Sequence, residues 1–210
     1  MFLKFLTAIF LTSTLLMTVA LAEEEKVVLA MGDSLMAGYN LPPNQGFPHQ
    51  LEDWLQEQGL NIRVINAGVS GDTTTAALER LEWTLAGAPN GKPDLFIVEF
   101  GGNDMLRGID PSLTRRNLDA ILKLATERNI KVLFTGMLAA PNMGPDYRAD
   151  FDAIYPELAE KYNVNFYPFF LEGVAGQPGL NLGDGIHPNV KGVGVMVENL
   201  GPVIEGLLND

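Results

Sequence analysis

The 210-residue sequence contains no cysteine and only two histidines, His49 and His187. The absence of cysteine excludes disulfide bonds, thiolate metal sites and any mechanism with a cysteine nucleophile. Without disulfides the fold must be stabilised by its core alone, which a chain of this size can supply. General base catalysis near neutral pH usually uses histidine, so only two positions are candidates for that role.

Basic residues are also scarce in this sequence. It has 14 Lys and Arg against 26 Asp and Glu, which gives a formal net charge of −12. Such a balance disfavours binding to nucleic acids and to anionic membrane surfaces, so we expect no nucleic-acid partner. Charged residues make up 19% of the chain without a long run of one sign, and no obligate protein partner is evident.

The chain has one long apolar run, at its N-terminus. Lys4 precedes apolar residues over 5–19, and Ala20-Leu21-Ala22 then offers small residues at the two positions that a signal peptidase reads. This layout predicts a signal peptide over residues 1–22, a single domain over residues 23–210, and export to the bacterial periplasm or medium. The alternative is an uncleaved membrane anchor, because the run approaches the length that spans a bilayer.

Short apolar runs then alternate with longer amphipathic segments. The runs are rich in β-branched and aromatic residues, which predicts buried strands at 27–31, 62–67, 95–100, 131–135 and 164–166. Helical periodicity predicts helices at 47–58, 73–85, 112–128, 147–162 and 189–208. This alternation is typical of parallel sheets with helices on both faces. We therefore predict an α/β fold, a three-layer α/β/α sandwich around about five parallel strands.

Small and polar residues follow the predicted strands. Segments 32–34, 68–72, 101–104 and 136–138 come after the first four strands, and segment 183–188 comes before the last helix. The carboxyl ends of parallel strands meet at one edge of a sheet, where α/β proteins bind their ligands. The sequence therefore predicts that these segments converge on a catalytic rim.

Asp184 and His187 are the candidate base pair of this rim. In a helical turn their spacing places both side chains on one face, so Asp184 could orient the imidazole while its other nitrogen accepts a proton. The alternative is that the two residues only cap the helix that follows Pro188. His49 has no acid or hydroxyl placed to use it and is interpreted as a surface helix residue.

Ser34 is the candidate nucleophile. It directly follows a predicted strand in Gly32-Asp33-Ser34-Leu35, where the first amides of a following helix would stabilise negative charge. The alternative is an N-cap serine, which is common at such junctions. The G-x-S-x-G elbow of ordinary α/β-hydrolases is absent around Ser34 and around Ser70, the rival nucleophile.

Four sequence blocks resemble those of the SGNH (GDSL-type) hydrolases. Gly32-Asp33-Ser34-Leu35 resembles block I, Gly71 lies in a segment that resembles block II, and segments 101–104 and 184–189 resemble blocks III and V. The blocks occur in order over nearly all of the predicted mature chain. Segments 101–108 and 147–156 further resemble the branch of bacterial arylesterases and of acyl-CoA thioesterase I/lysophospholipase L1.

The resemblance implies a flavodoxin-like SGNH hydrolase fold and a serine esterase mechanism without metal or organic cofactor. Ser34 would attack an acyl carbonyl, His187 would take its proton, and Asp184 would orient the imidazole. The oxyanion would be held by the backbone amides of Ser34 and Gly71 and by the side-chain amide of Asn103. Glycine permits close backbone approach, and asparagine supplies an uncharged donor, so the residue types suit these roles. Alone, Gly71 and Asn103 would be interpreted as turn or capping residues.

Three acids, Asp33, Asp72 and Asp104, each neighbour one of these residues. Such a cluster could instead form a divalent metal site. We interpret the acids as Asx-turn and helix-capping residues, which are common at loop starts. The chain departs from the family pattern at Met36 and Asn40, where relatives often have Thr or Ser and Gly. These departures leave the shape of the acyl pocket open and do not bear on the reaction.

Apolar residues flank the proposed oxyanion site on two segments. Met105 and Leu106 follow Asn103, while Leu138 and Pro141 follow the fourth predicted strand. We predict that they form walls for an acyl chain or aromatic ester, and the alternative for the segment after the fourth strand is an ordinary surface loop.

The predicted substrate is a small-molecule acyl ester or lipid. Short-to-medium acyl esters, aryl esters and lysophospholipids are expected, with thioesters cleaved in vitro because the tetrahedral chemistry is shared. Export and the acidic surface make acyl-CoA a poor natural substrate. Two other functions stay open at this stage: an envelope polysaccharide O-acyltransferase or deacetylase of the same fold, and a non-catalytic lipid-binding protein.

Overall fold

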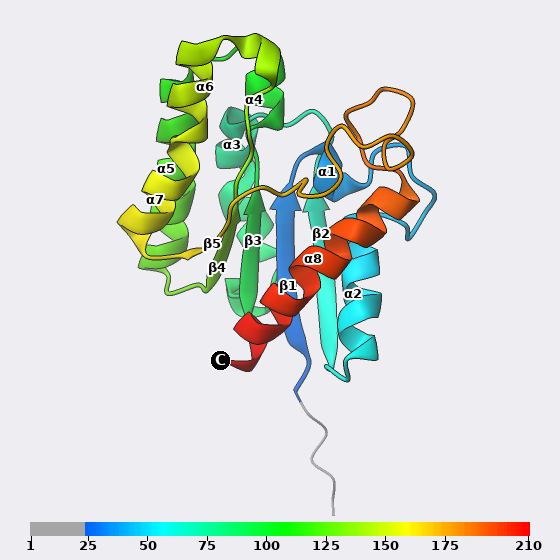
Figure 1. Ribbon diagram of the computed structural model, residues 1–210. Coiled ribbons are helices and arrows are strands. Elements are labelled where there is room, and N and C mark those ends of the chain that lie inside the picture. The colour runs from blue at the N-terminus through cyan, green and yellow to red at the C-terminus, as the bar shows by residue number, and fades with distance from the viewer. Residues whose placement is uncertain (1–23) are drawn as a thin grey trace, which may run out of the picture.

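The computed structural model describes residues 24–210, and the predicted signal peptide over residues 1–22 lies outside them. A five-stranded parallel sheet crosses the molecule in the order β2-β1-β3-β4-β5, as Figure 1 shows. The prediction of about five parallel strands is confirmed. The strands are β1 (Lys26–Gly32), β2 (Ile62–Gly68), β3 (Leu95–Glu99), β4 (Val132–Thr135) and β5 (Asn165–Tyr167).

Helices cover both faces of this sheet. Helix α2 (Phe47–Glu57) packs on α8 (Val190–Asn209), and both lie in front of β1 and β2 in Figure 1. Helix α3 (Thr74–Ala86) lies behind the sheet and packs on α5 (Pro111–Glu127), which packs on α7 (Ile154–Tyr162). The predicted three-layer sandwich is therefore confirmed. Shorter elements are α1 (Ser34–Ala37), α4 (Gly102–Leu106), α6 (Pro145–Asp152) and the 3₁₀ turns η1 (Pro89–Gly91) and η2 (Pro141–Met143).

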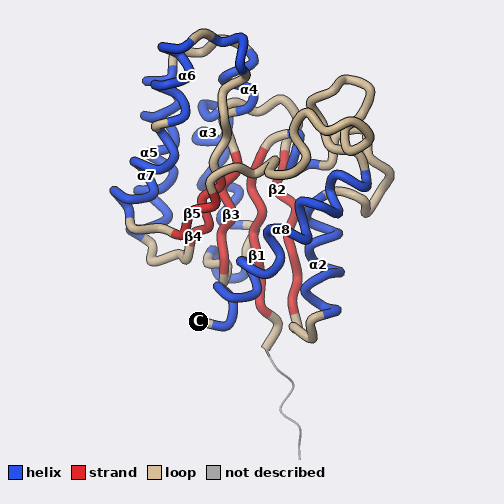
Figure 2. Tube along the Cα trace, in the orientation of Figure 1, coloured by secondary structure: helices blue, strands red, loops and turns tan. Residues whose placement is uncertain are grey.

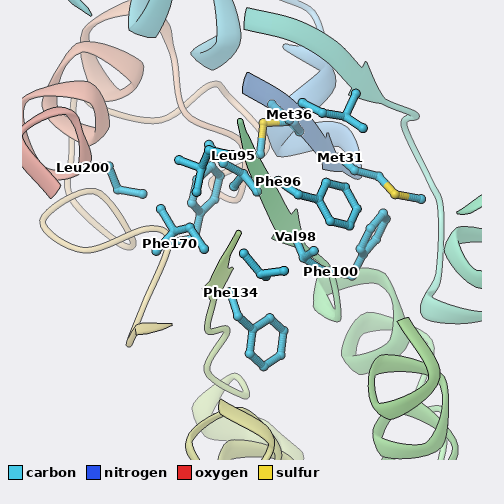
Figure 3. Packing of buried hydrophobic residues seen from close by; sticks show 14 of the residues in the cluster. Met31, Met36, Leu95, Phe96, Val98, Phe100, Phe134, Phe170 and Leu200 are labelled. Carbon is cyan, nitrogen blue, oxygen red and sulfur yellow. The ribbon is translucent and has the colours of Figure 1, made fainter. Parts of the chain in front are cut away.

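The central strands are buried on both faces. Every residue of β3 is buried, and so is every residue of β1 after the first. Figure 3 shows Phe96 and Val98 of β3 among Met31, Phe134 and Phe170, which come from three other parts of the chain. A continuous hydrophobic run is the expected pattern for a parallel strand with helices on both sides.

The parallel pairing places the carboxyl ends of the strands at one edge. Gly32 at the end of β1 pairs with Gly68 at the end of β2, and Glu99 of β3 pairs with Thr135 of β4. Figure 2 shows loops collecting beyond this edge, including the long segment between β5 and α8. The segments that follow the strands therefore share one rim, as their sequence positions predict.

Helical structure differs from the sequence-based prediction in two places. The single helix predicted over 147–162 is two helices, α6 and α7, interrupted at Ala153. Pro156 causes this break, because it has no N–H for the carbonyl of Asp152 and its ring crowds that carbonyl. Helices α1 and α4 are absent from the prediction because elements of four and five residues are too short to show a helical period.

Candidate active site

Ser34, His187 and Asp184 form a continuous hydrogen-bonded chain at the carboxyl edge of the sheet. The Oγ atom of Ser34 lies 2.9 Å from Nε2 of His187. On the other side of the ring, Nδ1 of His187 lies 2.7 Å from Oδ2 of Asp184. The fold thus brings together a hydroxyl and an imidazole that the sequence separates by 153 positions.

Asp184 and His187 lie in a loop rather than in the helical turn that their spacing suggests. Oδ1 of Asp184 accepts hydrogen bonds from the backbone N–H groups of Ile186 and His187, each at 3.0 Å, in an Asx-type turn. Helix α8 begins later and is capped by the side chain of Asn189, which accepts two N–H groups of the first turn. The alternative interpretation, in which Asp184 and His187 cap this helix, is therefore wrong.

The same turn makes the Asp184 carboxyl strongly acidic. Hydrogen bonds from the backbone N–H of His187, and then from its imidazole and the N–H of Ile186, lower the pKa of Asp184 to about 2. The carboxylate is therefore ionised throughout the neutral range. A charged acceptor beside Nδ1 favours the proton on that nitrogen, which leaves Nε2 unprotonated toward Ser34.

Ser34 is the first residue of α1. The N-cap of this helix is Asp33, whose Oδ1 accepts the N–H of Leu35 at 3.0 Å, so the capping role considered for Ser34 belongs to its neighbour. Gly68 makes room for α1, because a Cβ at that position would lie only 2.3 Å from the backbone nitrogen of Ala37. The glycine therefore lets α1 lie directly against the end of β2 and places Ser34 at the rim.

The three proposed oxyanion donors lie on three different segments. Asn103, in the first turn of α4, lines the same cavity as Ser34, and its side-chain amide donates to Oδ2 of Asp33 at 2.9 Å. Within residues 24–210, the backbone N–H groups of Ser34 and Gly71 donate no hydrogen bond. Gly71 does not line that cavity; it lies in the loop after β2 at φ +89°, and Arg107 donates to its carbonyl at 2.7 Å.

Arg80 of α3 joins the loop of Gly71 to the strand that precedes Ser34. Its Nε donates to Oδ2 of Asp72 at 2.6 Å, and its Nη2 donates to the carbonyl of Gly32 at 3.0 Å. Only 17% of the Arg80 side chain is exposed, so the ion pair is well shielded from solvent. Sequence reasoning missed Arg80, because no motif marks it and its partners belong to two separate loops.

A cavity of about 610 Å³ opens beside Ser34 and His187. Its walls come from α4, the segment after β4, α6, and the chain between β5 and α8, and most of them are apolar. All four residues predicted as substrate walls line this cavity, namely Met105, Leu106, Leu138 and Pro141. Their role in binding an acyl group stays a prediction.

Three residues between positions 36 and 40 lie near the site, but only Tyr39 contacts one of its proposed catalytic residues. Met36 is fully buried in the core, and neither Met36 nor Asn40 lines the cavity, so neither side chain forms part of its wall. Asn40 has φ +54°, a left-handed conformation that explains a frequent glycine there. Tyr39, which sequence reasoning missed, packs on the ring of His187 with centroids 4.5 Å apart.

The remaining candidates lie apart from the Ser34–His187–Asp184 chain. Ser70 is exposed, and no hydrogen bond in the described part of the chain joins it to a histidine. His49 is exposed on α2, in agreement with its interpretation as a surface residue. Asp72 pairs with Arg80, and Asp104 accepts hydrogen bonds from two threonine hydroxyls. Among residues 24–210, no group of three or more acidic or histidine side chains could hold a metal ion.

A hydroxyl, an imidazole and a carboxylate in hydrogen-bonded series are the working groups of a serine hydrolase. Residues 30–195 match the model of the GDSL-like lipase/acylhydrolase family. The chain belongs to this family, whose members are serine hydrolases that act on ester bonds.

Individual relatives are similar over most of the chain. Esterase TesA of Pseudomonas aeruginosa is 38% identical over 183 residues, which cover 87% of this chain and 90% of the relative. The thioesterase 1/protease 1/lysophospholipase L1 of Escherichia coli is 39% identical over 162 residues, covering 77% and 75%. The crystal structure of AlinE4, an SGNH-hydrolase family esterase, has 48% identity and a TM-score of 0.75, covering 88% of this chain and 97% of that one.

Proposed function

We propose that this protein is an exported serine esterase that hydrolyses carboxylic esters through an acyl-enzyme on Ser34. The observation that carries the proposal is the hydrogen-bonded chain from Ser34 Oγ through His187 to Asp184, with distances of 2.9 and 2.7 Å. These distances lie within the range required for proton transfer between nucleophile and base.

The reaction proceeds in two halves. Ser34 Oγ attacks the acyl carbon while Nε2 of His187 takes the hydroxyl proton, and Asp184 stabilises the imidazolium that forms. The tetrahedral intermediate expels the alcohol, which receives that proton from His187 and leaves the acyl group on Ser34. A water molecule then attacks the acyl-enzyme with His187 as base, releasing the carboxylic acid and restoring the Ser34 hydroxyl.

The developing oxyanion is proposed to bind the backbone N–H groups of Ser34 and Gly71 and the side-chain amide of Asn103. Two observations support this set. The two backbone N–H groups have no acceptor within residues 24–210, and Asn103 lines the cavity beside Ser34. Each donor of this kind typically contributes about 3 to 4 kcal/mol to transition-state stabilisation.

The substrates proposed for this chain are short-to-medium acyl esters, aryl esters and lysophospholipids, with thioesters cleaved in vitro. The apolar walls of the 610 Å³ cavity suit an acyl chain or an aromatic leaving group, because apolar surface is buried favourably there. The names of the relatives, esterase and thioesterase/lysophospholipase, cover the same bond types.

Export is proposed from the N-terminal sequence. Lys4, the apolar run and the small residues at 20 and 22 form the layout of a cleaved signal peptide. Within residues 24–210, no helix has the length and hydrophobicity that a membrane crossing needs. N-terminal sequencing of protein recovered from the periplasm or medium should begin at Glu23, and a product that keeps residues 1–22 would contradict cleavage.

The test of the activity is labelling and turnover with a matched pair of serine variants. Wild-type protein should hydrolyse p-nitrophenyl butyrate and react at Ser34 with a fluorophosphonate, with loss of fluoride. Ser34→Ala should lose both reactions, with kcat lower by at least about 1,000-fold. Ser70→Ala, in a neighbouring loop, should keep both. Protein that is inert and unlabelled would favour a lipid-binding function, and loss of labelling in Ser70→Ala would move the nucleophile to Ser70.

A further inference from the structure

The carboxyl group of Asp33 joins two segments of the proposed active site. Asp33 is only 2% exposed, although it directly precedes Ser34 in the rim. Oδ1 accepts the backbone N–H of Leu35 in α1 at 3.0 Å, and Oδ2 accepts the side-chain amide of Asn103 in α4 at 2.9 Å. One buried carboxyl group therefore fixes the helix that begins with the nucleophile and the side chain proposed to bind the oxyanion.

The contact with Asp33 determines how the Asn103 amide is oriented. A planar NH₂ group has two N–H donors, so fixing the direction of one also fixes the direction of the other. Within residues 24–210 the Asn103 amide nitrogen donates only to Asp33, and Asn103 lines the cavity beside Ser34. The second N–H is therefore available to a ligand in that cavity.

Building on the proposed esterase function, we infer that Asp33 is the positioning residue for the Asn103 side chain. Its carboxylate holds one N–H of the amide, so that the other faces the place where the oxyanion forms. Preorganised donors of this kind stabilise the transition state without reorganising during the reaction. Within residues 24–210, Asp33 makes no hydrogen bond to Ser34 Oγ or to His187, so its effect on the rate is inferred to act through Asn103.

Glu99 is a second buried acid that contacts Asp33. Glu99 is 1% exposed at the end of β3, and its Oε2 accepts a hydrogen bond from the N–H of Asp33 at 3.3 Å. Among residues 24–210, its Oε1 has no hydrogen-bond partner. Gly32 makes room for it, because a Cβ there would lie 2.5 Å from Oε2. Burial raises the pKa of Glu99 well above its ordinary value and that of Asp33 to about 6. The pKa of Asp33 still lies below neutral pH, so its side chain is a carboxylate there.

The competing role for Asp33 is helix capping alone, and one substitution separates the two roles. Asparagine caps helices as well as aspartate does, so Asp33→Asn keeps an oxygen for the N–H of Leu35. The same substitution places an NH₂ group toward the NH₂ group of Asn103, where two donors cannot bond. A cap-only role predicts normal kinetics for this variant, whereas the positioning role predicts a misdirected Asn103 amide.

The experiment is a double-mutant cycle of Asp33→Asn and Asn103→Ala, with kcat and KM measured on p-nitrophenyl butyrate. Asp33→Asn alone should lower kcat by about 10- to 100-fold, a large part of the loss expected for a missing oxyanion donor, with KM changed by less than about threefold. In the Asn103→Ala background, Asp33→Asn should lower kcat by less than about threefold further, because the amide that Asp33 positions is already absent. Fluorophosphonate labelling, which forms a tetrahedral oxyanion mimic, should slow in parallel with kcat.

Several controls keep the outcome unambiguous. Asp110 is the N-cap of α5, and its Oδ1 likewise accepts a hydrogen bond from the N–H two residues later, that of Ser112. Asp110→Asn should therefore keep normal kinetics. Asp33→Ser, which can cap but is too short to reach Asn103, serves if Asp33→Asn does not fold. Normal kcat in the Asp33 variants, or equal losses in both backgrounds, would overturn the inference. Failure of the proposed function would show separately, as wild-type turnover no greater than that of Ser34→Ala, and would remove the inference with it.

Discussion

At the residue scale, the proposed mechanism depends on His187 offering an unprotonated Nε2 to Ser34. Hydrogen bonding lowers the pKa of Asp184 to about 2, so this carboxylate stays ionised across the range in which the enzyme would be assayed. A loss of activity between pH 8 and 5 would therefore not come from protonation of this orienting acid.

We predict that kcat/KM falls as the pH is lowered from 8 to 5. A general base must be unprotonated to act, so activity is expected at high pH and its loss toward acid pH. The pKa of Asp33, raised to about 6 by burial, lies in the same range. The fall should therefore be measured in Asp33→Asn as well, where it should persist at a lower overall rate. A flat profile in either protein would remove His187 from its role.

The buried pair of Asp33 and Glu99 gives the fold its own dependence on pH. Burial raises both pKa values, so the folded protein holds protons that the unfolded chain has already released. The stability contributed by these groups is therefore fully present below about pH 4 and is lost as the pH rises through 6 and above. Each unit of raised pKa corresponds to about 1.4 kcal/mol.

We predict that Glu99→Gln gains stability relative to wild type as the pH rises. The amide cannot ionise, so the variant lacks the loss of stability that wild type suffers when its unfolded chain releases a proton that the folded protein retains. The free energy of unfolding is measured in urea at pH 5 and pH 8. The difference between variant and wild type should increase by at least about 1 kcal/mol from pH 5 to pH 8, with the variant becoming relatively more stable. The same change at Glu57, which is exposed on α2, should leave the difference constant. A constant difference for Glu99→Gln would mean that Glu99 is charged in the fold.

Sequence reasoning singled out Ser34, Asp184 and His187 as candidates because each sits in a short motif with few competitors. It did not find Glu99 or Tyr39, whose effects depend on long-range contacts. A glutamate inside an apolar run carries no sign that it will lie against Asp33, 66 positions earlier. Tyr39 follows Ser34 closely, yet its partner is the ring of His187 at the other end of the chain.

At the scale of elements, the aromatic series on α6 and α7 supports the turn that carries Asn103. The rings of Tyr147, Phe151 and Tyr155 pack one on the next, at four-residue spacing. The Tyr155 hydroxyl donates to the carbonyl of Phe100 at 3.0 Å in a fully buried site. Gly101 lies against it at φ +118°, and a Cβ there would fall 2.0 Å from that hydroxyl. Segment 147–156 is therefore packed against the start of segment 101–108 through Tyr155 and Gly101.

We predict that Tyr155→Phe lowers the free energy of unfolding by about 1 to 3 kcal/mol, because it leaves the Phe100 carbonyl buried without a donor. Tyr147→Phe is the matched comparison. Its hydroxyl donates to the carbonyl of Ile109 at 2.9 Å in a partly exposed site, where water can replace it, so the loss should be smaller. Urea unfolding of the two variants measures the difference. Equal losses would show that burial of the Phe100 carbonyl is unimportant.

The longer elements could be predicted from the sequence because hydrophobic periodicity marks them, and α5 and α8 differ from their predicted ranges by only a residue at each end. The short ones could not. Helices α1 and α4 begin with the proposed nucleophile and with the turn of Asn103, and they are held by caps and glycine contacts rather than by an apolar face. The sequence also could not show that Asp184 and His187 lie in a loop, because a spacing of three residues fits a helical turn equally well.

At the scale of the whole molecule, the net charge is expected to give anionic and neutral substrates different rates, even where the active site would accept both. The full chain has a net charge of −12, and removal of residues 1–22 with Lys4 makes it one unit more negative. Such a field repels anionic substrates at low ionic strength and has little effect on neutral ones. It extends about 30 Å at 10 mM salt and about 10 Å at 100 mM.

We therefore predict that kcat/KM for an acyl-CoA thioester rises by about 3- to 10-fold between 10 and 200 mM salt, as screening weakens the repulsion of its phosphates. The matched control is the N-acetylcysteamine thioester of the same acyl group, which carries the same reacting bond without charge and should change by less than about twofold. Both are measured with the same mature protein at constant pH. Arg148 lines the cavity and Arg107 lies by the Gly71 loop, so a rate for acyl-CoA that falls with salt would show that these local cations outweigh the net charge.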